Sequence, residues 1–149
     1  MPGVTVVNAL AVARERRIEI LESTSSAPIS FSNLMALRLK TSDEELSVAG
    51  TIFGREHLRL VDVDGVEVDT IPQGNLLFLK NEDTPGVVGQ VGTALGRHAV
   101  NIARMGLGRK PGSGRAIMLI EVDDEVPETV LAELATLPGI REARFVKLG

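Results

Sequence analysis

One stretch near the middle of the chain constrains the fold more than any other, because it joins a strand to a helix through a polar turn. Residues 76–80 form a short continuous apolar run, which is typical of a buried strand. Residues 87–98 place apolar side chains at helical spacing and predict a helix with one apolar face. The turn at 81–86 carries carboxylates and a Pro-Gly pair that opens the helix.

This turn has the chemistry of a site for a zwitterion. A helix N-terminus has backbone N–H groups without intrahelical partners and a partial positive charge, which suit a carboxylate or phosphate. Asp83 beside it could take an ammonium group. Free amino acids are zwitterions, so an amino-acid site is one interpretation. The simpler one is that Asp83 or Thr84 caps the helix while Pro85 and Gly86 set the turn.

The elements from this strand onward follow the order βαββαβ. After the first strand and helix we expect strands at 102–108 and 116–122, a helix at 128–136 and a last strand at 140–148. This order is that of a ferredoxin-like fold, with two helices on one face of an antiparallel sheet. The sheet edges and the uncharged strand at 116–120 favour side-by-side dimerisation.

The first half of the chain has a different order of predicted elements. We expect a helix at 4–17, a strand at 18–22 and a Ser/Pro loop at 23–32. A meander of four strands then follows, at 37–40, 46–54, 57–63 and 66–68. A Pro-Gly breaker cluster near residue 72 separates the halves, so we predict domains 1–73 and 74–149. The predicted class is α+β, a small α/β domain followed by a βαββαβ domain.

Composition excludes several classes of function. The 149 residues carry a net charge of −4, which gives no basic field for nucleic acid. The absence of cysteine rules out disulfides and thiolate metal sites and fits a reducing compartment. The apolar runs are too short to span a membrane. We therefore expect a soluble, cytoplasmic protein that binds neither membrane nor nucleic acid.

The residues offer no catalytic constellation. Only His57 and His98 are present, too few for most metal sites, so we predict no metal and no catalytic residue. Arg55, His57 and Arg59 could bind a phosphate or carboxylate, or form a solvated face.

Two glycine patterns bear on function. The first excludes a nucleotide-binding loop, and the second indicates that something packs closely against one side of the helix. The segment 86–92 lacks the ending of a phosphate-binding loop and the Gly-x-Gly-x-x-Gly spacing of a dinucleotide site. Gly89, Gly92 and Gly96 share one helix side, where either the sheet or a partner helix would pack closely. We interpret Gly106 and Gly108 as loop glycines.

Several segments carry a family resemblance. Residues 83–89, 100–103 and 137–140 resemble an ACT domain. Residues 7–9, 47–54 and 63–65 resemble the intervening domain of the longer D-3-phosphoglycerate dehydrogenases, also called the allosteric substrate-binding domain. The whole chain thus resembles the C-terminal regulatory region of that enzyme family.

The resemblance implies a ligand and its contacts. ACT domains of this family pair across two chains and bind free L-serine at the interface as a feedback inhibitor. The implied contacts come from the turn and from the start of the next strand: Asn81, Asp83, Pro85, Gly86, Val87, Val88, Asn101 and Ile102. Asp83 would face the ammonium group, the N–H groups around the helix start would receive the carboxylate, and Asn81 or Asn101 would reach the hydroxyl. Arg59 falls where some relatives place a basic residue of a second anion site.

The resemblance also implies what lies outside the chain. The parent enzyme oxidises 3-phosphoglycerate with NAD, but no cofactor and no catalysis are expected of this chain alone. The implied partners are a second copy of the chain and a catalytic domain, attached covalently or not. Two alternatives remain: the regulatory module of an iron–sulfur L-serine dehydratase, and a purely structural oligomerisation domain.

Overall fold

The computed structural model describes residues 3–24, 31, 33–54 and 56–148. Two compact units divide at residue 30 and are described separately. The described residues of the first contain one helix, α1 (Ala9–Glu15), preceded by Asn8. The Asn8 side chain accepts a hydrogen bond from the Thr5 backbone N–H at 2.6 Å. Because asparagine bonds readily to nearby backbone, it favours helix starts, and the helix begins later than the predicted 4–17.

The predicted strand at 18–22 is wrong. These residues form no strand, and Ile20 and Leu21 are 52% and 87% exposed. Residues 3–24 contain no other strand with which they could pair. Alternating apolar residues adopt a stable strand only when a neighbouring strand and a covered face are available.

The second unit begins with a four-stranded antiparallel sheet, which we call the meander sheet. Its strands pair in chain order and are β1 (Met35–Lys40), β2 (Glu45–Phe53), β3 (His57–Val63) and β4 (Val66–Thr70). Asp64 and Gly65 form the turn between β3 and β4, both with positive φ, at 52° and 72°. This conformation is the one that an Asp-Gly hairpin turn favours.

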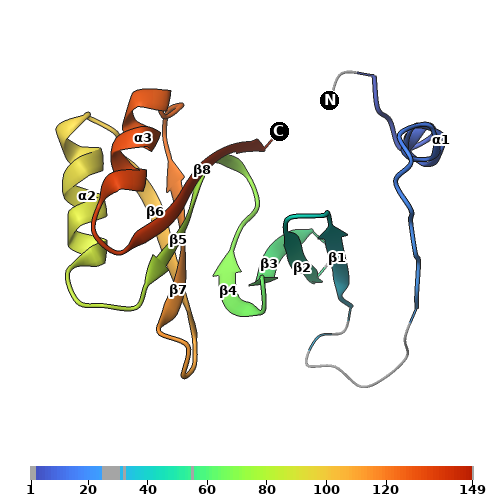
Figure 1. Cartoon of the computed structure of the whole chain (residues 1–149), viewed down its shortest axis with the longest axis horizontal. Helices are drawn as coiled ribbons and strands as arrows, with labels where there is room; N and C mark the ends of the chain where they lie inside the picture. Colours follow the sequence, from blue (N-terminus) through green and yellow to red (C-terminus); the bar gives the residue numbers. More distant parts are fainter. Residues whose placement is uncertain (1–2, 25–30, 32, 55, 149) are drawn as a thin grey trace. The chain divides into compact units, whose positions relative to one another are not determined.

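The remaining elements form a βαββαβ sheet, and the expected α+β class is confirmed. Its strands lie in the order β6-β7-β5-β8, all antiparallel. The elements are β5 (Gly74–Glu82), α2 (Val87–Arg97), β6 (Ile102–Lys110), β7 (Arg115–Val122), α3 (Glu128–Thr136) and β8 (Ile140–Leu148). Figure 1 shows both helices on one face of this sheet and β4 on the side away from them.

The larger core lies between the βαββαβ sheet and its two helices. Leu77 and Leu79 of β5, and Met118 and Ile120 of β7, are fully buried there against Leu95 of α2. The uncharged strand 116–120 is therefore the middle of a covered sheet rather than an exposed surface. Its apolar side chains therefore give no reason to expect a dimer. Only the open edge strands of the sheet, β6 and β8, still favour dimerisation.

A second, smaller core fills the opposite face of the same sheet. Leu76, Ile117 and Leu119 point away from the helices and pack against Val63, Val66 and Val68 of the meander sheet. Successive strand residues point to opposite faces, so β5 and β7 supply both cores. Strands buried on both faces read as continuous apolar runs, which explains the patterns at 76–80 and 116–120.

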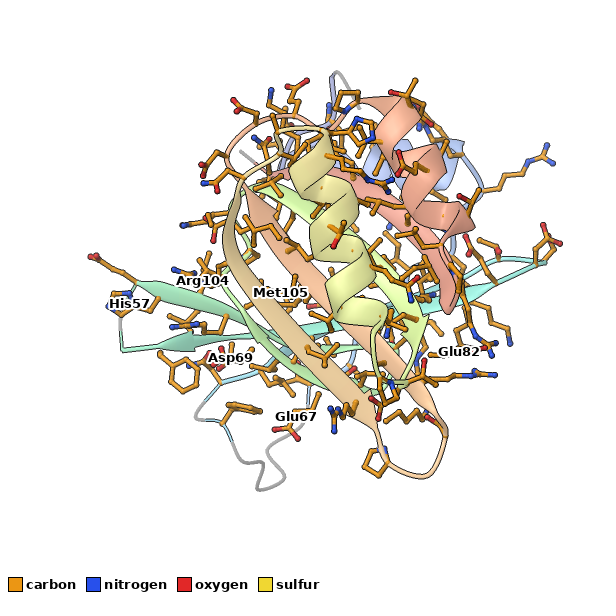
Figure 2. All side chains as sticks on the ribbon, turned by 90° about the vertical axis from the view of Figure 1, so that its left-hand side faces the viewer. His57, Glu67, Asp69, Glu82, Arg104 and Met105 are labelled. Carbon is orange, nitrogen blue, oxygen red and sulfur yellow. The ribbon has the colours of Figure 1, made fainter. Side chains whose placement is uncertain are left out.

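Two glycines allow β4 to lie directly against β6. A Cβ on Gly108 would come within 2.3 Å of the Glu67 backbone oxygen, and one on Gly106 within 3.0 Å of the Thr70 hydroxyl oxygen. In Figure 2, Glu67 and Asp69 of β4 lie behind β6, which carries the labelled Arg104 and Met105. The interpretation of these glycines as loop residues is wrong, since both lie inside a strand and permit close approach of another backbone.

Candidate functional site

The polar turn after β5 is held in place by two neighbouring loops. The Asp83 N–H donates to the Gly114 carbonyl at 2.9 Å, and the Glu82 N–H donates to the Gly139 carbonyl at 2.8 Å. Gly139 has φ of 84°, and a Cβ there would lie 2.9 Å from the Val87 side chain. A side chain at 139 would therefore crowd the buried Val87 side chain in the first turn of α2. The Leu-Pro-Gly sequence that ends α3 thus also positions this turn.

Helix α2 begins without a side-chain cap. Gly86 is the N-cap residue, with φ of 92°, and no side chain hydrogen-bonds to the first turn. The interpretation of Asp83 or Thr84 as the cap is therefore wrong. Pro85 and Gly86 are exposed, Val87 is buried and Val88 is 42% exposed. The first N–H groups of the helix remain free of side-chain acceptors, as an anion site requires.

The Asp83 carboxylate is paired with a residue that sequence reasoning missed. The Arg109 Nε lies 3.3 Å from Asp83 Oδ1, and both side chains are partly exposed. An exposed pair of this kind contributes about 0–1 kcal/mol, so a ligand ammonium group can compete for the carboxylate. The only signal in the sequence was a basic residue near the end of β6, and strand register decides whether it reaches Asp83.

Asn81 is buried rather than presented to solvent. It is 3% exposed, its Nδ2 donates to the Glu82 carbonyl at 2.8 Å, and its Oδ1 has no hydrogen-bond partner. An unpaired buried polar atom costs about 1–3 kcal/mol. Asn81 therefore either tolerates this cost or gains a donor when the turn changes.

Asn101 lies at the other end of the sheet from Asp83. Its Nδ2 donates to Asp123 Oδ2 at 2.6 Å, and the adjacent Ile102 pairs with Val122. From Ile102 to Arg109, β6 rises about 23 Å, at about 3.3 Å per residue. Figure 2 shows Glu82, next to Asp83, well apart from Arg104 near the start of β6. One chain alone cannot bring Asp83 and Asn101 to one small ligand.

One side of α2 faces no other part of the described chain. A Cβ on Gly89, Gly92 or Gly96 would meet nothing within 4 Å. Of the two explanations for this glycine stripe, packing against the chain's own sheet is therefore excluded. Close approach of another molecule remains.

The second predicted anion site is only partly described. Arg55 lies outside the described residues, and His57 and Arg59 lie on β3. Arg59 pairs with Asp69 at 3.1 Å. The hollow beside it, about 430 Å³, is lined chiefly by apolar side chains such as Leu37, Ile52 and Leu58. These surroundings do not favour an anion, and the site stays a prediction.

His98 lies at the C-terminus of α2, partly exposed and away from the turn. Its Nε2 lies 2.6 Å from Glu133 Oε2 on α3, and Arg97 contacts the same carboxylate. The hydrogen bond from His98 and the charges of both neighbours lower the pKa of Glu133. This cluster links the two helices. Among the described residues, no three His, Cys, Asp or Glu side chains form a group suited to a metal ion.

Two family models match the chain in succession. Residues 1–64 match the D-3-phosphoglycerate dehydrogenase intervening domain, and residues 75–139 match the ACT domain. The polar turn, Asn101 and Gly139 all fall in the second match, while His57 and Arg59 fall in the first. In the described part of the chain, no helix has the length and apolarity needed to cross a membrane.

Curated relatives match nearly the whole chain. The chain is 33% identical to D-3-phosphoglycerate dehydrogenase of Methanocaldococcus jannaschii over 99% of its length, and 39% identical to that of Archaeoglobus fulgidus over 97%. The enzyme of the same name from Synechocystis is 36% identical over 97% of the chain. The chain spans about a quarter of the length of these relatives: 28%, 28% and 26%, respectively.

Proposed function

The chain belongs to the intervening-domain and ACT-domain families of D-3-phosphoglycerate dehydrogenases, and on this premise we propose that it is a regulatory module that senses L-serine. The ligand would bind between two copies of the chain. The module would then act on a catalytic domain, attached covalently or not, that oxidises 3-phosphoglycerate with NAD. The chain itself would carry no catalytic residue and no cofactor.

One observation carries the proposal: the predicted contacts lie at the two ends of a single open edge strand. Asp83 and Arg109 stand at one end of β6 and Asn101 at the other. Pairing β6 with its copy about a two-fold axis near Met105 would bring the partner's Asn101 beside Arg109. Each dimer would then contain two complete sites, each built from both chains.

The chemistry at such a site suits a free amino acid. Asp83 would exchange Arg109 for the ligand ammonium group, and the uncapped N–H groups around Gly86, Val87 and Val88 would receive its carboxylate. The partner's Asn101 would reach the hydroxyl. Asn81 Oδ1, which lacks a donor in the single chain, would gain one when the turn adjusts.

A site shared between chains couples binding to assembly. Ligand that contacts both chains stabilises the paired state, and coupling to an attached catalytic domain would amount to a differential affinity of about 1–3 kcal/mol. The intervening-domain match and the names of the relatives favour this function over the iron–sulfur dehydratase module. A purely structural oligomerisation domain is the outcome left if no amino acid binds.

Thermal unfolding of the purified chain with and without L-serine tests the proposal, with glycine and L-alanine as controls. A ligand that binds only the native state stabilises it by about 2.7 kcal/mol at a hundredfold excess over Kd. We expect a serine-specific shift that Asp83→Ala abolishes. Asp69→Asn, which also removes an exposed, ion-paired carboxylate, should keep the shift.

The assembly state separates the remaining alternatives. Light scattering should show a dimer, which serine stabilises against dilution. A folded dimer that responds to no amino acid would reject serine sensing and leave assembly alone. A monomer that still binds serine would reject the shared site.

A further inference from the structure

A polar cleft of about 340 Å³ lies where the meander sheet meets the βαββαβ sheet. Its walls come from both sheets. The meander sheet contributes Glu45, Asp64 and Val66, and the βαββαβ sheet contributes Lys80, Asn81, Lys110, Arg115, Ala116, Ile117 and Arg141. Four cationic side chains therefore line the cleft against two carboxylates.

The carboxylates of the cleft are already engaged. Lys80 Nζ lies 2.8 Å from Asp64 and 3.2 Å from Glu142. Glu45 pairs with Arg38 at 3.3 Å, outside the cleft. Arg141 contacts Glu82 at 3.1 Å. Within the described part of the chain, Lys110 and Arg115 have no ion pair of their own.

These two cations, which form no ion pair among the described residues, lie opposite each other. On its other side Arg115 is the register partner of Glu82, whose carboxylate already pairs with Arg141. Lys110 on β6 and Arg115 on β7 are direct register partners. Like charges directly opposite on neighbouring strands destabilise a sheet. Lys110 also reaches across the cleft, since its Nζ lies 3.7 Å from where a Cβ of Gly65 would stand, on the β3–β4 turn. An anion held by both side chains would remove the repulsion.

We propose that this cleft is a binding site for a small phosphate-bearing anion, held chiefly by Lys110 and Arg115. A guanidinium group offers a planar pair of donors that matches phosphate geometry, and an ammonium group adds a compact charge. The volume suits a phosphate or a small phosphate monoester. Because the cleft is walled by both sheets, the bound anion would hold them together.

The cleft and the proposed amino-acid site share Asn81, but their charged anchors lie on opposite faces of the sheet. Lys110 follows Arg109 on β6, so the two side chains point to opposite faces of the sheet. Gly108, two residues before Lys110, contacts β4, which places Lys110 on the meander side. Arg109 pairs with Asp83, at the start of α2. Removing the charged anchors of one site therefore leaves those of the other in place.

Thermal unfolding and calorimetric titration with two probes, inorganic phosphate and glycerol 3-phosphate, test the site. Sodium chloride at matched ionic strength is the reference. We expect phosphate to raise the Tm above the chloride value. Arg115→Gln should weaken phosphate binding about tenfold, and the double variant Lys110→Met/Arg115→Gln should abolish it. Tighter binding of the monoester would identify an organic phosphate as the ligand, and equal affinity would identify free phosphate.

Matched controls separate binding from stability. Lys147→Met/Arg104→Gln removes the same charges elsewhere on the βαββαβ sheet and should keep the phosphate response. In chloride, the double variant of the cleft should be at least as stable as the wild type, because the repulsion is gone. Asp83→Ala should keep the phosphate response. The proposal would be overturned if phosphate did not stabilise the wild type, or if it stabilised the double variant as much as the wild type.

Discussion

The two sheets of this protein have four strands each, but they are covered very differently. The βαββαβ sheet has helices on one face and β4 on the other, and its central strands bury apolar side chains on both faces. In the meander sheet, every residue of β1 is exposed, including Met35 at 71% and Leu37 at 64%. Only the β3–β4 end of the meander sheet shares a core. Apolar residues at strand spacing therefore contribute to stability in one sheet far more than in the other.

This comparison also locates function. The βαββαβ sheet supplies a rigid platform, and the candidate contacts lie in the turn and at the strand ends around it. Sites held by such a platform can be both exposed and well positioned. The meander sheet meets the platform through the shared core at β3 and β4, and through ion pairs such as that of Lys80 with Asp64, so a signal could pass between the sheets at these contacts.

The largest expected effect is the contrast between equivalent leucines of the two sheets. Leu79→Ala in the buried strand β5 should lower the free energy of unfolding by about 2–5 kcal/mol, because it leaves a cavity. Leu37→Ala in β1 should change it by no more than about 0.5 kcal/mol. Urea unfolding measures both. Equal losses would show that the outer face of the meander sheet is covered in solution.

A smaller effect tests the contact between the sheets. Gly108→Ala should destabilise the protein by about 1–3 kcal/mol, because the new methyl group meets a backbone oxygen that cannot move alone. Gly106→Ala is the matched control on the same face of β6, where the neighbouring Thr70 side chain can rotate. Urea unfolding should rank Gly108→Ala as the more damaging. The reverse order would place β4 away from β6.

The smallest expected effect concerns the ion pair that joins the sheets. Burial lowers the pKa of Lys80, but hydrogen bonds and charges from Asp64 and Glu142 outweigh it, so the pKa lies above its ordinary 10.5. A raised folded-state pKa stabilises the protein below 10.5, and this contribution disappears as the pH rises through the folded value. Removing Lys80 should therefore cost stability near neutral pH and progressively less in alkali.

Urea unfolding of Lys80→Met across this pH range measures the effect, which we expect to stay below about 1 kcal/mol. The chain contains no tyrosine or cysteine, so few other groups titrate there. Lys147→Met removes a lysine from an exposed pair at the other end of the sheet and is the control. A stability difference for Lys80→Met that persists unchanged at high pH would contradict the assignment.

Most of the elements could be predicted from the sequence. Periodicity identified the strands and helices from residue 35 onward, and the bounds of β3, α3 and β8 agree with the structure. The strand at 18–22 was wrong because an alternating pattern does not supply a neighbouring strand. Gly106 and Gly108 were misread because their reason lies in β4, some forty residues earlier in the chain.

For the candidate site, the sequence by itself determined which groups are available: a carboxylate, a helix start that follows a Pro-Gly pair and an asparagine before the next strand. Only the structure showed that no side chain caps this helix. Only the tertiary structure decided that Arg109 pairs with Asp83, that Asn81 is buried, and that Asn101 lies at the far end of β6. The spacing of apolar residues that predicts helices and strands follows from backbone geometry, so it can be recognised in the sequence. Register and strand order depend on contacts between distant segments, and these appear only when both cores are packed.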